Sequence, residues 1–451
     1  MKRDAIDLSK TNVYALFCKY LFPTLMGMLS ISAVTAIDGI FVGHGVGSQG
    51  IAAVNICIPL LMLLTGAGLM VGAGCSVVAS VHLARGKARV ARINVAQALA
   101  FASLLALLPC LAVEAFPVAT SRLLGSSPTL LPQVLDYLVW FAPSWVFNMW
   151  IAVGLFVIRL DGSPRYAMMC SVTSSVLNVV LDWLLIFPLG MGVKGASIAS
   201  TISIIVGGMM AVGYLAFGAR QLWLCRLKMS VKSLRLALRN VGYQCRIGSS
   251  ALLGEATMAV FMYMGNRVFM HYLGDDGVGA FGIVCYYAPF VFMIGNAVAQ
   301  SAQPIVSYNH GLGLDQRVRQ AVRVALVAAV VCGLLPTAAF SLAPRGMVSL
   351  FLSLDTNAAR IAVEGFPLWA TGLVCFVVNV TAVGCYQSVE RVLPATVFAL
   401  LRGMVLLVPS FLLMPLLLGD AGIWLAMPVS ETLTTLLIAL HATIPHSNSH
   451  A

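Results

Sequence analysis

Long apolar segments recur along almost the whole chain, and they limit its fold more than any other feature of the sequence. A bilayer core of about 30 Å needs roughly 20 apolar residues per helix, and only helices or closed barrels satisfy the backbone polar groups there. The runs lack alternation of apolar and polar residues, so they predict helices. We expect about twelve spans, near residues 14–41, 51–81, 93–118, 134–158, 165–189, 194–217, 245–272, 278–303, 318–343, 362–387, 392–416 and 421–442.

The low content of charged residues excludes a water-soluble protein. Charged residues make up 10% of the chain and hydrophobic residues 60%, whereas a soluble domain carries about 25% charged residues. The length of 451 residues would otherwise suggest several soluble domains. We therefore predict an all-α polytopic membrane protein that forms one membrane domain with two halves.

Lys and Arg residues gather between alternate spans, and this bias predicts the orientation of the chain. With a cytoplasmic amino terminus, the inward segments carry a large excess of basic residues: Arg85, Lys87, Arg89, Arg92, Arg159, Arg165, Arg220, Arg226, Lys228, Lys232, Arg235, Arg239, Arg246, Arg317, Arg319, Arg323, Arg391 and Arg402. The outward segments hold only Arg122, Lys194, Arg267, Arg345 and Arg360. We expect both termini in the cytoplasm. The net charge of +11 then reflects orientation in a membrane and not a nucleic-acid partner, because the basic residues form no continuous patch.

A basic polar stretch, residues 218–246, divides the chain into halves. We expect an amino-terminal lobe of six helices at 1–217, a basic cytoplasmic linker at 218–244 and a carboxy-terminal lobe of six helices at 245–451. One constant offset pairs Gly68 with Gly295, Gly86 with Gly313 and Arg92 with Arg319, which indicates a weak internal repeat. Each lobe has an even number of spans, so the two are predicted to be parallel repeats about an axis along the membrane normal.

Ionisable groups inside predicted spans are costly and usually functional, and we take four carboxylic acids as candidates. They are Asp38, Asp182, Glu255 and Glu431. Asn178 lies four residues before Asp182 and therefore on the same helical face, and the hydroxyls of Ser200 and Thr201 could join them. Two carboxylates, an amide oxygen and a hydroxyl suit Na⁺, and a pair of carboxylates also suits a proton, so both ions stay open. A buried network that only sets helix packing is the structural alternative.

Three further buried or partly buried groups have competing interpretations. Glu255 can be a coupling group or a structural partner of another polar residue, and Glu431 is expected to be a neutral packing carboxyl more than a second coupling group. Arg402 is about ten residues inside its predicted span, so we expect its guanidinium to extend to the inner interface.

Three segments carry a resemblance to a known family: AIDGIFVGHGVGSQGIAAVNI, LNVVLDWLLIFPLGMGVKGASIAS and AQPIVSYNHG. They resemble segments of the MATE (multidrug and toxic compound extrusion) family, and the whole chain is most similar to its bacterial DinF/MepA-like branch. The resemblance implies a cation-coupling site at Asp38, Asn178, Asp182 and Ser200, with Na⁺ as a candidate ligand of the first three. Ser200 stands where Thr is commoner. It also implies a coupling role for Glu255 and, less directly, for Glu431.

The resemblance further implies a secondary active exporter that antiports lipophilic organic cations against Na⁺ or H⁺ by alternating access. It implies a monomer in the bacterial inner membrane, with the ion as the only cofactor. We expect no enzyme activity, because the sequence has no nucleotide-binding loop, zinc-protease motif or nucleophile elbow. The alternatives are a lipid-linked precursor flippase, which the concentration of basic residues in loops disfavours, a membrane-embedded lipid enzyme, and a homologue that has lost transport.

Overall fold

The computed structural model describes residues 7–227 and 230–443, and within these ranges the chain is helical with no strand. Lys228 and both chain ends therefore lie outside the described residues. Two short π-helical turns, η1 (Tyr214–Gly218) and η2 (Leu401–Val405), interrupt the α-helices. The helices are α1 Val13–Val46, α2 Ser48–Ala84, α3 Ala88–Ala115, α4 Pro117–Leu123, α5 Leu131–Phe141, α6 Ser144–Leu160, α7 Pro164–Ile186, α8 Gly192–Gly213, α9 Val231–Gly311, α10 Asp315–Leu342, α11 Pro344–Ser349, α12 Asn357–Ala370, α13 Leu373–Ser388, α14 Val392–Leu400, α15 Leu407–Leu418 and α16 Asp420–Thr443.

The helices confirm a polytopic all-α fold. Nine helical segments of the described chain are long and apolar enough to cross a membrane, and two bent pairs, α5 with α6 and α12 with α13, raise the number to eleven. Pro143 lies at the first of these bends, where it lacks the N–H that a continuous helix needs. The long α9 consists of two helices joined at Gly274, whose φ of 63° is readily adopted only by glycine. With α9 counted as two spans, the structure agrees with the prediction of about twelve.

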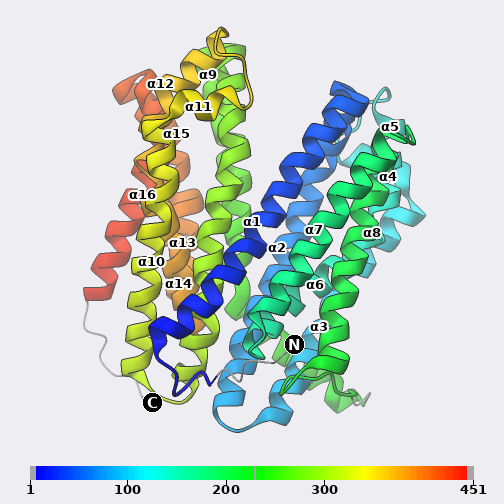
Figure 1. Cartoon of the computed structure of the whole chain (residues 1–451), viewed down its shortest axis with the longest axis vertical. Helices are drawn as coiled ribbons and strands as arrows, with labels where there is room; N and C mark the ends of the chain where they lie inside the picture. Colours follow the sequence, from blue (N-terminus) through cyan, green and yellow to red (C-terminus); the bar gives the residue numbers. More distant parts are fainter. Residues whose placement is uncertain (1–6, 228–229, 444–451) are drawn as a thin grey trace.

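The two halves of the chain lie side by side in Figure 1, α1 to α8 on the right and α9 to α16 on the left. They spread apart toward the top of this view and approach one another toward the bottom, while α1 runs obliquely between them. Ser80 and Ser307 are 227 positions apart, the same offset that pairs Gly68 with Gly295, and their hydroxyls are 2.9 Å apart. Equivalent residues of two repeats related by a two-fold rotation can touch only near the rotation axis. The axis of the repeat therefore passes between α2 and α9.

Where the two halves approach one another, glycine contacts and neutral hydrogen bonds join α2 to α9. A Cβ atom on Gly74 would overlap the carbonyl of Gln244, and one on Gly248 would overlap the carbonyl of Met70. The Gln303 amide donates a hydrogen bond of 3.0 Å to the Ala73 carbonyl. Small residues allow two helix backbones to approach closely, and dispersion contacts then stabilise the pair.

The segment between the halves is only partly an irregular linker. The carboxylate of Asp161 accepts hydrogen bonds from the backbone N–H groups of Arg220, Gln221 and Leu222, at 2.7, 2.8 and 3.0 Å. The guanidinium of Arg92 lies over the Trp223 ring, 3.1 Å from its centroid. The later part of the expected linker, 218–244, belongs to α9, which already begins at Val231.

Candidate functional site

Two carboxyl groups face each other in the amino-terminal half. Helix α1 carries Asp38 and α7 carries Asp182, whose side chain is fully buried. Oδ1 of Asp38 and both carboxyl oxygens of Asp182 are buried and receive no hydrogen bond from the donor groups of the described residues. The two carboxyls are close enough to share a hydrogen bond when one of them is protonated. No described Lys or Arg forms an ion pair with either of them.

Neutral oxygen atoms lie on the same helix as Asp182 and on the adjoining α8. Asn178, one turn before Asp182 on α7, donates a hydrogen bond of 3.1 Å to the Ser200 hydroxyl of α8. Oδ1 of Asn178 is buried and receives no hydrogen bond from a described residue, and the buried hydroxyl of Ser197 likewise has no partner among the described residues. Thr201 does not join the group, because its hydroxyl donates to the backbone carbonyl of Trp140.

The chemistry of this site suits a hard monovalent cation or a proton. Two carboxylates in contact repel one another unless a proton or a cation lies between them. Carboxylate, amide and hydroxyl oxygens are the ligands that hard cations prefer. Among the residues that the structure describes, no three His, Cys, Asp or Glu side chains come together, so a bound cation here would need the neutral oxygens as ligands.

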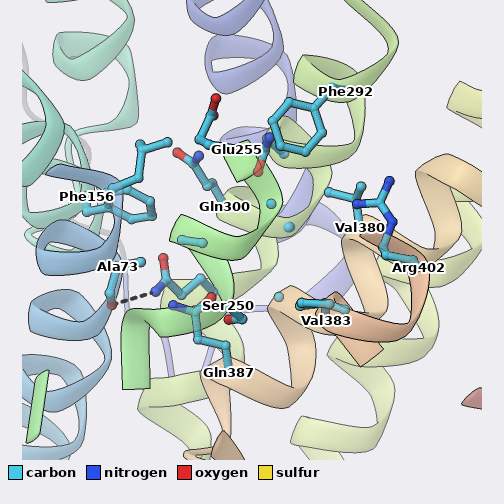
Figure 2. A pocket seen from close by; sticks show the side chains of 18 residues that line it. Ala73, Phe156, Ser250, Glu255, Phe292, Gln300, Val380, Val383, Gln387 and Arg402 are labelled. Carbon is cyan, nitrogen blue, oxygen red and sulfur yellow. Dashed lines mark hydrogen bonds between the residues drawn. The ribbon is translucent and has the colours of Figure 1, made fainter. Parts of the chain in front are cut away.

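A pocket lies between the two halves, and Glu255 of α9 contributes to its wall (Figure 2). Its lining includes Phe156 of α6 from one half and Phe292, Gln387 and Arg402 from the other. Glu255 is 8% exposed, and its Oε1 has no hydrogen-bond partner in the described chain. The structure therefore places Glu255 apart from the carboxyl pair, in the pocket and without the structural partner that the alternative interpretation requires.

Arg402 and Glu431 form a buried ion pair, so two expectations were wrong. The guanidinium of Arg402 does not extend to an interface: the residue is 3% exposed and Glu431 is 2% exposed. Nη2 of Arg402 is 2.9 Å from Oε1 of Glu431, Nε is 3.1 Å from the same oxygen, and Asn379 Nδ2 donates to Oε2 at 2.7 Å. Glu431 therefore has a cationic partner and is not a neutral packing carboxyl.

Arg159 is also buried and does not lie in a loop as expected. It is the penultimate residue of α6 and is 3% exposed. Its Nη1 donates a hydrogen bond of 2.6 Å to the side-chain oxygen of Gln300 on α9, and its Nε has no partner in the described ranges. Arg159 and Arg402 are therefore exceptions to the concentration of basic residues in loops.

Comparisons with known proteins agree on one family. The family model MatE matches residues 23–184 and 251–412, two stretches of equal length. The FAD transporter of Shewanella oneidensis is 24% identical over 420 residues, which are 91% of this chain and 90% of that protein. The multidrug export protein MepA of Staphylococcus aureus is 22% identical over 433 residues, 96% and 94% of the two chains. A solved structure described as the outward-facing conformation of a multidrug resistance MATE family transporter superposes with a TM-score of 0.87 at 19% identity and covers 96% of each chain.

Proposed function

The chain belongs to the MatE family and is a multi-pass membrane transporter and not an enzyme, and from this premise we propose that it is a secondary exporter driven by Na⁺ or H⁺ at Asp38, Asn178, Asp182 and Ser200. The ion enters the acidic site from outside the cell, and the substrate leaves through the space between the halves. We further propose that it acts as a monomer in the bacterial inner membrane with both termini in the cytoplasm.

The observation that carries this proposal is the pair of carboxyls, which has no cationic partner among the described residues. Asp38 and Asp182 lie on two helices, α1 and α7, that pack along each other. Their mutual repulsion depends on whether a proton or a cation is bound, so the packing of α1 on α7 responds to the ion. If the ion binds one packing of α1 on α7 more strongly than the other by about 1.4–2.7 kcal/mol, the equivalent of one to two pKa units, the equilibrium between the two packings shifts roughly ten- to hundred-fold.

The arrangement of the halves supports alternating access. Neutral hydrogen bonds and glycine contacts join α2 to α9 at one end of the molecule, and breaking them exposes no unpaired charge. Arg159 adds a charged hydrogen bond to Gln300 across the halves. Helix α1 contacts α7 of its own half and also α9 and α10 of the other half. A rearrangement of α1 at the carboxyl pair is therefore transmitted directly to the contact between the halves.

The pocket supports an organic cation as the substrate. Glu255 provides a buried carboxyl without a partner, and Phe156 and Phe292 provide aromatic surface. Aromatic walls with one acidic group suit lipophilic cations. The names of two relatives refer to multidrug export and to FAD transport, so membership of the family does not fix the charge of the substrate.

The proposal is tested by efflux of a fluorescent lipophilic cation from vesicles under separate Na⁺ and H⁺ gradients. Asp38→Asn and Asp182→Asn are expected to abolish efflux driven by one of the two gradients, whereas the matched control Asp136→Asn changes an exposed residue of α5 and leaves efflux intact. Full gradient-driven efflux in well-folded Asp38→Asn and Asp182→Asn variants would show that the pair is only part of the scaffold.

A further inference from the structure

The pocket wall from the carboxy-terminal half carries hydrogen-bond donors that no described residue accepts from. Ser250 and Gln387 both line the pocket and are 3% and 7% exposed. The Ser250 hydroxyl and the Gln387 Nε2 have no hydrogen-bond partner in the part of the chain that the structure describes. Burying a polar group without a partner costs about 1–3 kcal/mol. Two such donors on one pocket wall indicate a ligand that accepts hydrogen bonds there.

Arg402 makes this wall electropositive. Its Nε and Nη2 bond Glu431, and no hydrogen bond joins its Nη1 to any described residue. Arg402 lines the pocket, whereas Glu431 and Asn379 do not. The pocket wall therefore includes the cationic residue of the ion pair and not its acidic partner.

Glu255 gives the pocket a second, negative pole. Ser250, Ala251, Gly254 and Glu255 line the pocket from one face of α9, and five residues of helix separate Ser250 from Glu255 by about 7.5 Å along its axis. In Figure 2 Glu255 lies near the top of the pocket and Gln387 near the bottom, with Arg402 at one side. In the same view Phe156 lies at the left side of the pocket and Phe292 at the upper right, beside Glu255.

We propose that Ser250 and Gln387, on the pocket wall that Arg402 also lines, form a subsite for an oxyanion of the substrate, a carboxylate or a phosphate group. The subsite rests on the proposed transport function and narrows its substrate class. The substrate has an aromatic body, a cationic or donor group toward Glu255 and an oxyanion toward Ser250 and Gln387. A guanidinium and two neutral donors match the lone pairs of such an oxyanion, and they do not match a second cation.

The test compares two probes that differ only in this charge: a rhodamine with a free carboxylate and its methyl ester. Binding of each probe to the purified protein is measured by fluorescence polarisation, without an ion gradient. Ser250→Ala and Gln387→Leu are expected to lower the ratio of free-acid affinity to ester affinity on the order of ten-fold, the effect of losing a hydrogen bond to a charged group. Gln387→Glu keeps the length of the side chain and lowers the ratio further, because it adds a negative charge to the subsite.

Two controls fix the interpretation. Ser249→Ala removes the neighbouring hydroxyl, which bonds Thr396 and lies outside the pocket lining, and leaves the ratio unchanged. Glu255→Gln raises the ratio, because it weakens the negative pole. An unchanged ratio in Ser250→Ala and both Gln387 variants, or no saturable binding of the free acid to wild type, overturns the subsite. Because binding needs no gradient, a failure of ion-driven efflux would refute the transport proposal and leave this test in force.

Discussion

Breaking the ion pair of Arg402 and Glu431 is predicted to lower the stability of the protein more than breaking any other buried contact of the carboxy-terminal half. Glu431→Gln leaves the guanidinium of Arg402, 3% exposed, without its negative partner and weakens four hydrogen bonds to that carboxylate. Removing one partner of a buried pair costs about 3–5 kcal/mol. For a chain of this size we expect Tm to fall by about 5 °C, measured in detergent by the loss of monodisperse protein on heating.

The double variant Arg402→Met, Glu431→Leu separates the cost of an unpaired charge from the value of the contact. Replacing a buried pair by apolar residues of similar volume is often neutral. Asn379 keeps a partner, because its Nδ2 also donates to the backbone carbonyl of residue 431 at 2.8 Å. The double variant is therefore expected to recover most of the lost Tm. A single variant as stable as wild type, or a double variant less stable than both singles, would refute this reasoning.

Two further predictions concern the contact between the halves. Gly248→Ala places a Cβ against the carbonyl of Met70 and is expected to cost about 1–3 kcal/mol by overpacking, seen as a lower Tm, whereas Gly242→Ala, with open space around its Cβ, has no such effect. Gln300→Glu places a carboxylate against Arg159 and is expected to raise Tm while slowing gradient-driven efflux, because the new ion pair stabilises one packing of the halves; a faster efflux would contradict this.

The spans were predictable from sequence because hydropathy is a local property. Each run of apolar residues predicts a span without reference to the rest of the chain. In the structure, Gly274 alone separates the two helices of α9. The start of α9 at Val231 was not predictable in this way. Its first turns are polar and basic, and such a composition is typical of a linker between spans. The Ser230 cap and the continuation into apolar sequence nevertheless support a helix.

The error at Arg402 came from treating a span as isolated in lipid. Depth along a single helix suggested that the guanidinium could reach an interface, but the π-helical turn at 401–405 and the packing of α16 bury it beside Glu431. The two residues are 29 positions apart, so no local pattern joins them. The sequence places opposite charges in two spans of the same half, and such groups usually pair. This feature could have predicted the ion pair. Ser250 and Gln387 gave no comparable signal, since uncharged polar residues are common in membrane helices.

Because the two halves are repeats of one another, a difference between the counter-charges of their carboxyl groups points to a difference in their roles. In the amino-terminal half the carboxyls of Asp38 and Asp182 form no ion pair with a described Lys or Arg, so under the proposed mechanism an exchangeable ion balances their charge. In the carboxy-terminal half Glu431 is balanced by Arg402, a cation that cannot leave. An ion gradient can act only on a site whose counter-charge exchanges with solvent, so under the proposed mechanism α1 and α7 respond to the ion. Arg402 then stays charged through the cycle, and the pocket wall that it lines stays available to the substrate in both packings of the halves.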